Sequence, residues 1–130
     1  MHTILIDDNS TSVFLTELLL KREGFAQHIH SFGGAQEALD YLHETLPTRV
    51  PDVIFLDLNM PLMDGWEFLD ALEPYQEKLA QRCRIYILTS SLAPTDAVRA
   101  KDYPLVSGLV HKPVDSQMLR SIREEISGRN

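Results

Sequence analysis

Residues 53–68 read VIFLDLNMPLMDGWEF, and the point at which the apolar run in this stretch ends is decisive for both the fold and the site. The run that begins at Val53 is typical of a central β-strand covered on both faces. It ends in one acidic residue, Asp57. A carboxylate at the end of a buried strand is costly to desolvate without a partner, so it indicates either a cap or a reactive group. The residues that end the other strands distinguish these two interpretations.

The composition predicts one globular domain that spans residues 1–130. Hydrophobic residues make up 44% of the chain and charged residues 24%, which is typical of a folded protein rather than a disordered one. The formal net charge of −7 disfavours binding to the phosphate backbone of a nucleic acid. The one cysteine, Cys83, cannot form an internal disulfide, and neither a signal peptide nor a membrane-spanning apolar run is evident. We therefore expect a cytoplasmic protein that does not bind membranes.

Strand-like and helix-like segments alternate along the chain. The segments 3–6, 25–32, 52–58, 84–90 and 107–113 are expected to be strands. Helical spacing covers 10–24, 33–46, a stretch that begins near Gly65, 95–101 and 115–127. Because parallel neighbours require crossover connections, this order predicts an α/β fold with a single doubly wound parallel sheet of five strands and five helices.

Local features refine this expectation. Pro74 is expected to break or kink the helix that begins near Gly65, and helical turns are expected to resume over 75–82. Gly65 is expected to take a positive φ in the turn that follows Asp57. The segment 10–24 places four apolar residues on one helical face: Phe14, Leu15, Leu18 and Leu19.

Polar residues follow four of the five expected strands, where the chain leaves the sheet. In open parallel sheets the carboxyl ends of the strands lie at one edge, and ligands bind there. The sequence therefore predicts that acidic, amide, hydroxyl and lysine side chains gather at one rim of the sheet. They are Asp7, Asp8, Asp57, Asn59, Thr89, Ser90 and Lys112.

Such a rim needs positive charge, because carboxylates held close together repel one another. Lys112 supplies one positive charge, and a hard divalent cation would supply the remainder. Magnesium prefers oxygen ligands and keeps waters that a phosphate can replace. Zinc is not expected, because no cysteine or histidine is predicted at this rim. A carboxylate beside Mg²⁺, a lysine and a hydroxyl suits phosphoryl transfer in which the carboxylate attacks phosphorus.

Four motifs, taken together and in this order, resemble the receiver domain of response regulators, the flavodoxin-like or CheY-like fold, over essentially the full chain. They are IDDN at 6–9, FLDLNMPLMDGWEF at 55–68, ILTSS at 87–91 and VHKPV at 110–114. The resemblance implies that Asp57 accepts a phosphoryl group from a histidine kinase or a histidine phosphotransfer protein in a Mg²⁺-dependent reaction. It also implies that Lys112 pairs with this group, that the Thr89 hydroxyl moves to bind it, and that the Lys112–Pro113 bond is cis.

The same resemblance assigns the metal ligands. Asp8 corresponds to the principal Mg²⁺ ligand, and Asp7 to the neighbour that holds a metal-bound water. Asp57 itself and the main-chain carbonyl of Asn59 complete the expected set. The resemblance implies no enzyme activity beyond catalysis of the protein's own phosphorylation and dephosphorylation.

The chain is predicted to be a stand-alone response regulator that signals by contact with another protein and not through nucleic acid. A relay intermediate or phosphate sink is an open alternative. A small Mg²⁺-dependent phosphohydrolase that forms an aspartyl phosphate is another, but such enzymes typically need an acid two residues after the nucleophile, where this chain has Asn59. The intact set of Asp7, Asp8, Asp57 and Lys112 argues against a pseudo-receiver that carries no phosphate.

Two positions depart from the family pattern. Leu109 stands three residues before Lys112, where many relatives carry tyrosine or phenylalanine, and a leucine cannot make the swing of an aromatic ring. Ser90 follows Thr89, where many relatives carry alanine, and it is the alternative switch hydroxyl. The output face is expected to comprise helix 95–101, strand 107–113 and helix 115–127, with Leu109 as its switch-linked residue.

Two other features have simpler interpretations. His28 and His30 lie on one face of an edge strand and could bind a metal, but the sequence offers no third ligand, and an exposed strand face is the preferred interpretation. Trp66 is expected to pack at the surface rather than to form a platform for a ligand.

Overall fold

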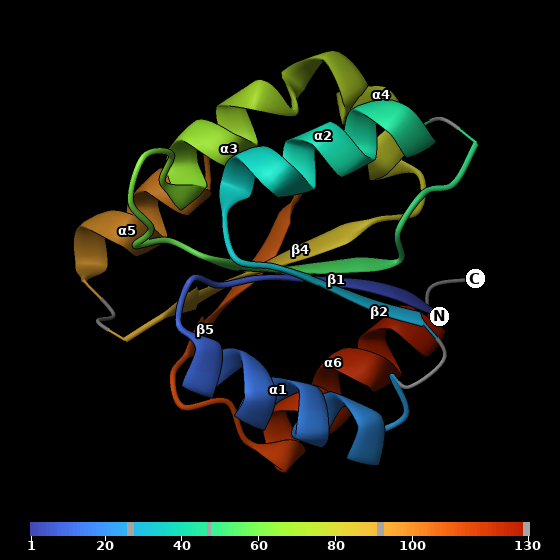
Figure 1. Cartoon of the computed structure of the whole chain (residues 1–130), viewed down its shortest axis with the longest axis vertical. Helices are drawn as coiled ribbons and strands as arrows, with labels where there is room; N and C mark the ends of the chain where they lie inside the picture. Colours follow the sequence, from blue (N-terminus) through green and yellow to red (C-terminus); the bar gives the residue numbers. More distant parts are fainter. Residues whose placement is uncertain (26–27, 47, 91–92, 129–130) are drawn as a thin grey trace.

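The computed structural model describes residues 1–25, 28–46, 48–90 and 93–128, in which strands and helices alternate (Figure 1). No helix in these ranges is long and apolar enough to cross a membrane. The strands are β1 (His2–Ile6), β2 (His28–Phe32), β3 (Val53–Asp57), β4 (Arg84–Thr89) and β5 (Val106–His111). The helices are α1 (Ser10–Arg22), α2 (Ala35–Thr45), α3 (Gly65–Ala71), α4 (Gln76–Ala80), α5 (Pro94–Ala100) and α6 (Ser116–Ser127), with a 3₁₀ turn, η1, at Glu73–Tyr75.

The five strands form one sheet in the order β2-β1-β3-β4-β5, and every neighbouring pair is parallel. The predicted doubly wound α/β fold is therefore confirmed. Residues 26 and 27 of the expected second strand lie outside the described residues. β1 and β3 are buried along their whole length, because each has a strand on both sides and helices over both faces. The edge strands β2 and β5 are more exposed.

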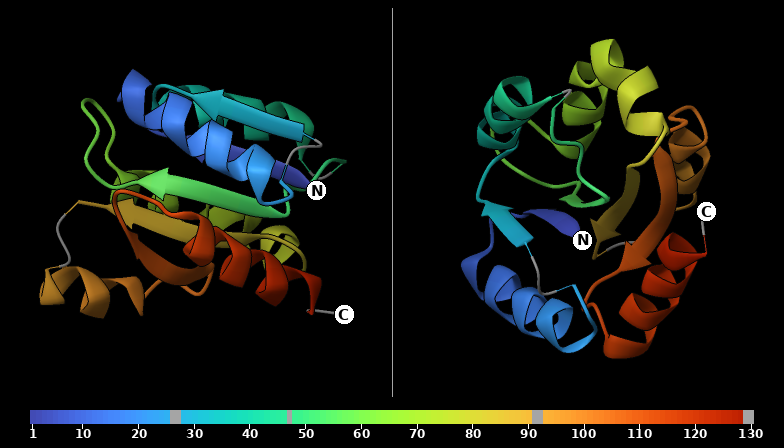
Figure 2. Two further views of the ribbon diagram at one scale, coloured as in Figure 1. Left: turned by 90° about the horizontal axis from the view of Figure 1, so that it is seen from below. Right: turned by 90° about the vertical axis from the view of Figure 1, so that its right-hand side faces the viewer.

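Helices cover the two faces of the sheet as separate layers. Figure 1 shows α2, α3, α4 and α5 on one face and α1 and α6 on the other, and the two views of Figure 2 agree with this arrangement. Each layer has its own hydrophobic core. Ile54 of β3 belongs to the core beneath α2 and α3, whereas the next residue, Phe55, belongs to the core beneath α1 and α6, because successive side chains of a strand point to opposite faces.

The helix count differs from the prediction, because the described residues contain six α-helices and not five. The segment expected as one interrupted helix divides into α3, η1 and α4. Pro74 lies in the first positions of η1, where its missing N–H and its ring prevent α3 from continuing. The break expected at Pro74 is confirmed, and the part of the chain that resumes is a separate short helix.

Most of the apolar face of α1 does not enter the core, and of its four residues only Leu19 packs against it. Phe14, Leu15 and Leu18 have exposed fractions of 62%, 54% and 51%, and Leu19 is half-buried. The residues that α1 buries are Thr16 and Leu20. Burial in the core therefore accounts for little of the apolar surface that the sequence places on this helix.

The turn after β3 uses Leu62 and Gly65 for different purposes. The expectation of a positive φ at Gly65 is wrong, and Leu62 takes this conformation instead, with φ of 71°. Glycine is required at position 65 by a close approach of two backbone segments. The Gly65 amide donates a hydrogen bond to the Leu58 carbonyl oxygen at 3.0 Å, and a Cβ on Gly65 would lie 2.9 Å from the Leu58 Cα. The start of α3 is therefore held directly against the backbone that follows Asp57.

We expect Gly65→Ala to lower the free energy of unfolding by about 2 kcal/mol, because the added methyl group overlaps backbone atoms that cannot move aside cheaply. Urea denaturation monitored by circular dichroism measures the change. Gly33→Ala is the matched control, because no heavy atom lies within 4 Å of a Cβ built at that position. Equal stability of the two variants would contradict the close approach.

Candidate functional site

Asp57 is the last residue of β3, and this strand fixes its carboxylate at the rim of the sheet. The residue is 6% exposed. The backbone amide of Asn59 donates a hydrogen bond to Oδ1 of Asp57 at 3.2 Å, so the turn folds back against the carboxylate. Because β3 is buried and pairs with β1 and β4, the position of this carboxylate is well defined.

The end of β1 brings two further acids to the same rim. Asp7 is 1% exposed, whereas Asp8 is exposed to solvent. The Asn9 amide donates a hydrogen bond to Oδ1 of Asp7 at 3.0 Å. Oδ1 of Asn9 in turn accepts a hydrogen bond from the Ser12 amide at 2.9 Å and caps the first turn of α1. The start of α1 therefore holds the acid pair in place.

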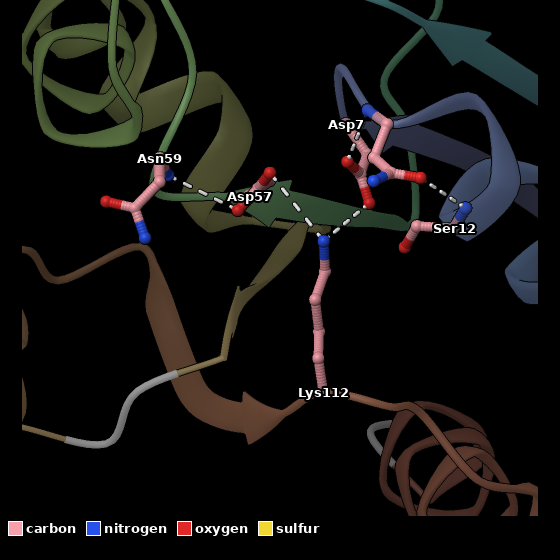
Figure 3. A network of polar contacts seen from close by, with 6 residues as sticks. Asp7, Ser12, Asp57, Asn59 and Lys112 are labelled. Atoms are coloured by element: carbon pink, nitrogen blue, oxygen red, sulfur yellow. Dashed lines mark hydrogen bonds and ion pairs between the residues drawn. The ribbon is translucent and has the colours of Figure 1, made fainter.

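Lys112 follows β5 and reaches both buried acids (Figure 3). Its Nζ lies 2.7 Å from Oδ2 of Asp7 and 3.6 Å from Oδ2 of Asp57. Its backbone amide donates a hydrogen bond to the Thr89 carbonyl oxygen at 2.8 Å. The Lys112–Pro113 peptide is cis, as the family resemblance predicted. The shortest contact of the ammonium is with Asp7, a pairing that the sequence did not indicate.

The two buried acids differ in how easily they ionise. Burial raises the pKa of the Asp57 carboxyl above its ordinary value, and the Lys112 ammonium and the Asn59 amide offset this effect only in part. At Asp7 burial acts in the same direction, but hydrogen bonds from Lys112 and from the Asn9 amide outweigh it and hold the pKa below its ordinary value. Asp7 is therefore the better stabilised anion of the pair, and burial leaves the ionised form of Asp57 less stable.

Carboxylate oxygens of Asp7, Asp8 and Asp57 lie within 4.8 Å of one another. One ammonium cannot balance three carboxylates at this separation, so the set fits a divalent cation. Mg²⁺ suits it best, because all the available ligands are hard oxygen atoms and the exposed position of Asp8 leaves room for water. Asn59 lies beside the cluster through its hydrogen bond to Asp57.

The two hydroxyl candidates differ in burial. Thr89 is the last residue of β4 and is 1% exposed, whereas Ser90 is exposed. β4 lies between β3 and β5, so Thr89 ends a strand between the one that carries Asp57 and the one that Lys112 follows. The assignment of Thr89, and not Ser90, as the switch hydroxyl stays a prediction.

The histidines of the edge strand do not form a second metal centre in the described part of the chain, where the acid cluster is the one group of three or more residues placed to bind a metal. His28 is exposed as expected, and His30 is half-buried. The ring of His30 lies against His2 and Tyr41, with centroid distances of 5.3 Å and 5.0 Å. The expectation of a surface position for Trp66 is wrong, because this residue is 7% exposed.

Comparisons with known proteins agree with this geometry. Residues 3–124 match the family model of the response regulator receiver domain. The probable methanogenesis regulatory protein FilR2 of Methanothrix harundinacea is 33% identical over 128 residues, which cover 95% of this chain and 79% of that protein. Hybrid signal transduction histidine kinase C of Dictyostelium discoideum is 27% identical over 92% of this chain, but the match spans only 10% of that protein. The crystal structure of a two-component response regulator from Cytophaga hutchinsonii has a TM-score of 0.89 and 26% identity, over 98% of this chain and 96% of that one.

We expect Asp57→Asn to raise the free energy of unfolding by about 1 kcal/mol near neutral pH when divalent cations are absent. The pKa of Asp57 is raised in the folded protein, so ionisation of this acid makes folding less favourable as the pH rises from the ordinary pKa through the raised one. The amide removes this loss, while Lys112 keeps its 2.7 Å contact with Asp7.

Urea denaturation of both proteins in the presence of a chelator measures the difference. The gain in stability should shrink at acidic pH, where the wild-type carboxyl is protonated in both states. A variant that is less stable than the wild type at neutral pH would show that ionised Asp57 is a net stabilising partner of Lys112.

Proposed function

The chain belongs to the response regulator receiver domain family, and from this premise we propose that Asp57 accepts a phosphoryl group from a phosphohistidine of a histidine kinase or a histidine phosphotransfer protein. The observation that carries the proposal is the meeting of Asp7, Asp8, Asp57 and Lys112 at one rim of the sheet. Asp57 is the acid whose pKa is raised, and it lies at the end of the central strand. Its position beside Lys112 suits it to be the nucleophile.

The reaction exchanges one bond to phosphorus for another. An Oδ atom of Asp57 attacks the phosphorus atom of the phosphohistidine, an O–P bond forms, and the P–N bond breaks, so that its electron pair returns to the imidazole. A Mg²⁺ ion, when bound, would offset the charge on the phosphoryl oxygens. Asp7, Asp8, Asp57 and the carbonyl of Asn59 would hold this ion.

Lys112 and Thr89 respond to the new group. The Lys112 ammonium is already 3.6 Å from Oδ2 of Asp57, so a small movement away from Asp7 brings it to a phosphoryl oxygen. Such a movement replaces one charge-assisted contact with another. The Thr89 hydroxyl binds a second phosphoryl oxygen. Attack of water on phosphorus then breaks the bond between phosphorus and Asp57, which releases phosphate and regenerates the carboxylate. The phosphorylated state is therefore temporary.

We infer that this domain acts in the cytoplasm and signals by protein contact, without binding nucleic acid. A relay role is the alternative, and transfer of the phosphoryl group from Asp57 back to a histidine phosphotransfer protein would distinguish it. A phosphohydrolase is not favoured. Asn59 stands where such an enzyme needs its second acid.

The exposed apolar face of α1 suits the protein that donates the phosphoryl group. Phe14, Leu15 and Leu18 are more than half exposed, and a groove of about 540 Å³ runs between α1 and Pro113–Val114. The groove includes Ser12, which lies beside the Asp7 acid pair, and it ends at the residue after Lys112. A partner whose histidine reaches Asp57 covers this rim and buries the apolar face, which fits an amphipathic helix of the donor.

Phosphorylation is expected at Asp57 alone. Incubation with Mg²⁺ and a small phosphodonor such as acetyl phosphate should add the mass of one phosphoryl group, measured by mass spectrometry of the intact protein. Asp57→Asn should add none, and a chelator should abolish labelling of the wild type. Stoichiometric labelling of Asp57→Asn would overturn the assignment.

A substitution on α1 should affect phosphoryl transfer from a protein donor but not from a small-molecule donor. Leu18→Ala is expected to lower kcat/KM for transfer from a phosphorylated protein donor by about tenfold, because the apolar contact is lost at the interface. The rate with acetyl phosphate should not change, since Leu18 lies outside the rim. Val98→Ala is the control, because Val98 is 65% exposed on α5 in the other helical layer. Equal losses with both donors would place the effect of Leu18 on the site itself.

A further inference from the structure

A cluster of four side chains joins α3 to α5. The Arg99 guanidinium carbon lies 4.6 Å from the centre of the Trp66 ring, and the Tyr103 ring lies 5.4 Å from the same ring. The Tyr103 hydroxyl donates a hydrogen bond to Oδ1 of Asp70 at 2.8 Å. Trp66 and Asp70 belong to α3, whereas Arg99 lies on α5 and Tyr103 follows that helix. A cation stacked on an indole is a favourable contact even near the surface.

This cluster adds to the few buried contacts that hold α5. Ala100 is the one residue that the described helix buries, and Val98 is 65% exposed. With so little apolar burial of its own, α5 belongs to the elements of the fold that move at low cost. The contacts of Arg99 and Tyr103 with α3 therefore have a large influence on where α5 lies.

The other end of the cluster is fixed to the phosphoacceptor strand. Trp66 follows Gly65, whose amide is hydrogen-bonded to the Leu58 carbonyl at 3.0 Å. A Cβ on Gly65 would also lie 3.0 Å from the Asp57 carbonyl oxygen. The backbone that carries the indole is therefore fixed relative to Asp57, and α5 contacts the indole through Arg99.

The position on β5 that many relatives fill with an aromatic ring holds Leu109, a half-buried aliphatic residue. In this chain the aromatic rings that contact the α5 segment belong to Trp66 and Tyr103 instead. We propose that Trp66 anchors α5 to the turn after Asp57, and that Arg99, stacked on the indole, holds α5 in its resting position. The proposal rests on the phosphoacceptor function given above and specifies how that site is read out.

Thr89 precedes α5 in the chain. If its hydroxyl moves toward a phosphoryl group on Asp57, α5 shifts as well. Trp66 cannot follow, because α3 is held against the backbone after Asp57. The contact between Arg99 and Trp66 therefore opens when α5 shifts, and the free energy of this contact favours the resting state. By linkage, removal of the contact raises the affinity for a phosphoryl group or its mimic.

Arg99→Ala provides the test, and because Arg99 is exposed the variant should fold. We expect it to bind beryllofluoride with Mg²⁺ about threefold to fivefold more tightly than the wild type. Fluorescence of Trp66 follows the titration, since the chain contains one tryptophan. Amides of α5 should also exchange faster in the unliganded variant than in the unliganded wild type.

Two further variants separate coupling from general loosening. Arg99→Lys keeps a cation over the ring and should restore most of the wild-type behaviour. Lys101→Ala removes an exposed charge from the residue that caps α5 and should behave as the wild type does. Wild-type affinity for beryllofluoride in Arg99→Ala would overturn the coupling while leaving the phosphoacceptor function intact. Failure of the wild type itself to bind beryllofluoride would overturn the phosphoacceptor function and the coupling with it.

Discussion

The charge balance at the rim of the sheet is the constraint on which the site depends. Three carboxylates lie within 4.8 Å of one another, and the ammonium of Lys112 makes its shortest contact with Asp7 at 2.7 Å. The lysine thus satisfies one acid and leaves another with a raised pKa. Such an arrangement gives two neighbouring acids different tasks, because the satisfied one stays an anion that can hold a cation and the other remains available to react.

The sheet and the rim could be predicted because both depend on local patterns. Apolar runs of strand length alternate with helical spacing, and this order admits a parallel sheet. Asp7, Asp57 and Lys112 meet because each ends or follows a parallel strand, and such strands end at one edge. The number of helices could not be predicted in the same way. Pro74 shows where a helix must stop, but it does not determine whether the chain beyond continues as a bend or as a new helix.

Some contacts between distant segments could not be predicted from the sequence. The periodicity of α1 shows that Phe14, Leu15 and Leu18 share a face, but not whether the sheet covers that face. Nothing near Trp66 in the chain indicates that Arg99 stacks on it, because that contact depends on how α5 is placed over α3. The Asp7–Lys112 pair is similar, because the side-chain geometry at the rim determines which of the two acids lies closer to the lysine.

The division of the molecule into two helical layers has a consequence for how it binds other proteins. The exposed face of α1 and the loosely held α5 lie on opposite sides of the sheet, with separate cores beneath them. A phosphodonor bound to α1 would leave α5 uncovered, so a target that contacts α5 need not compete with the donor for surface. One molecule could then be phosphorylated while it is already bound to its target. Its response time would depend on an internal shift of α5 and not on the exchange of one partner for another.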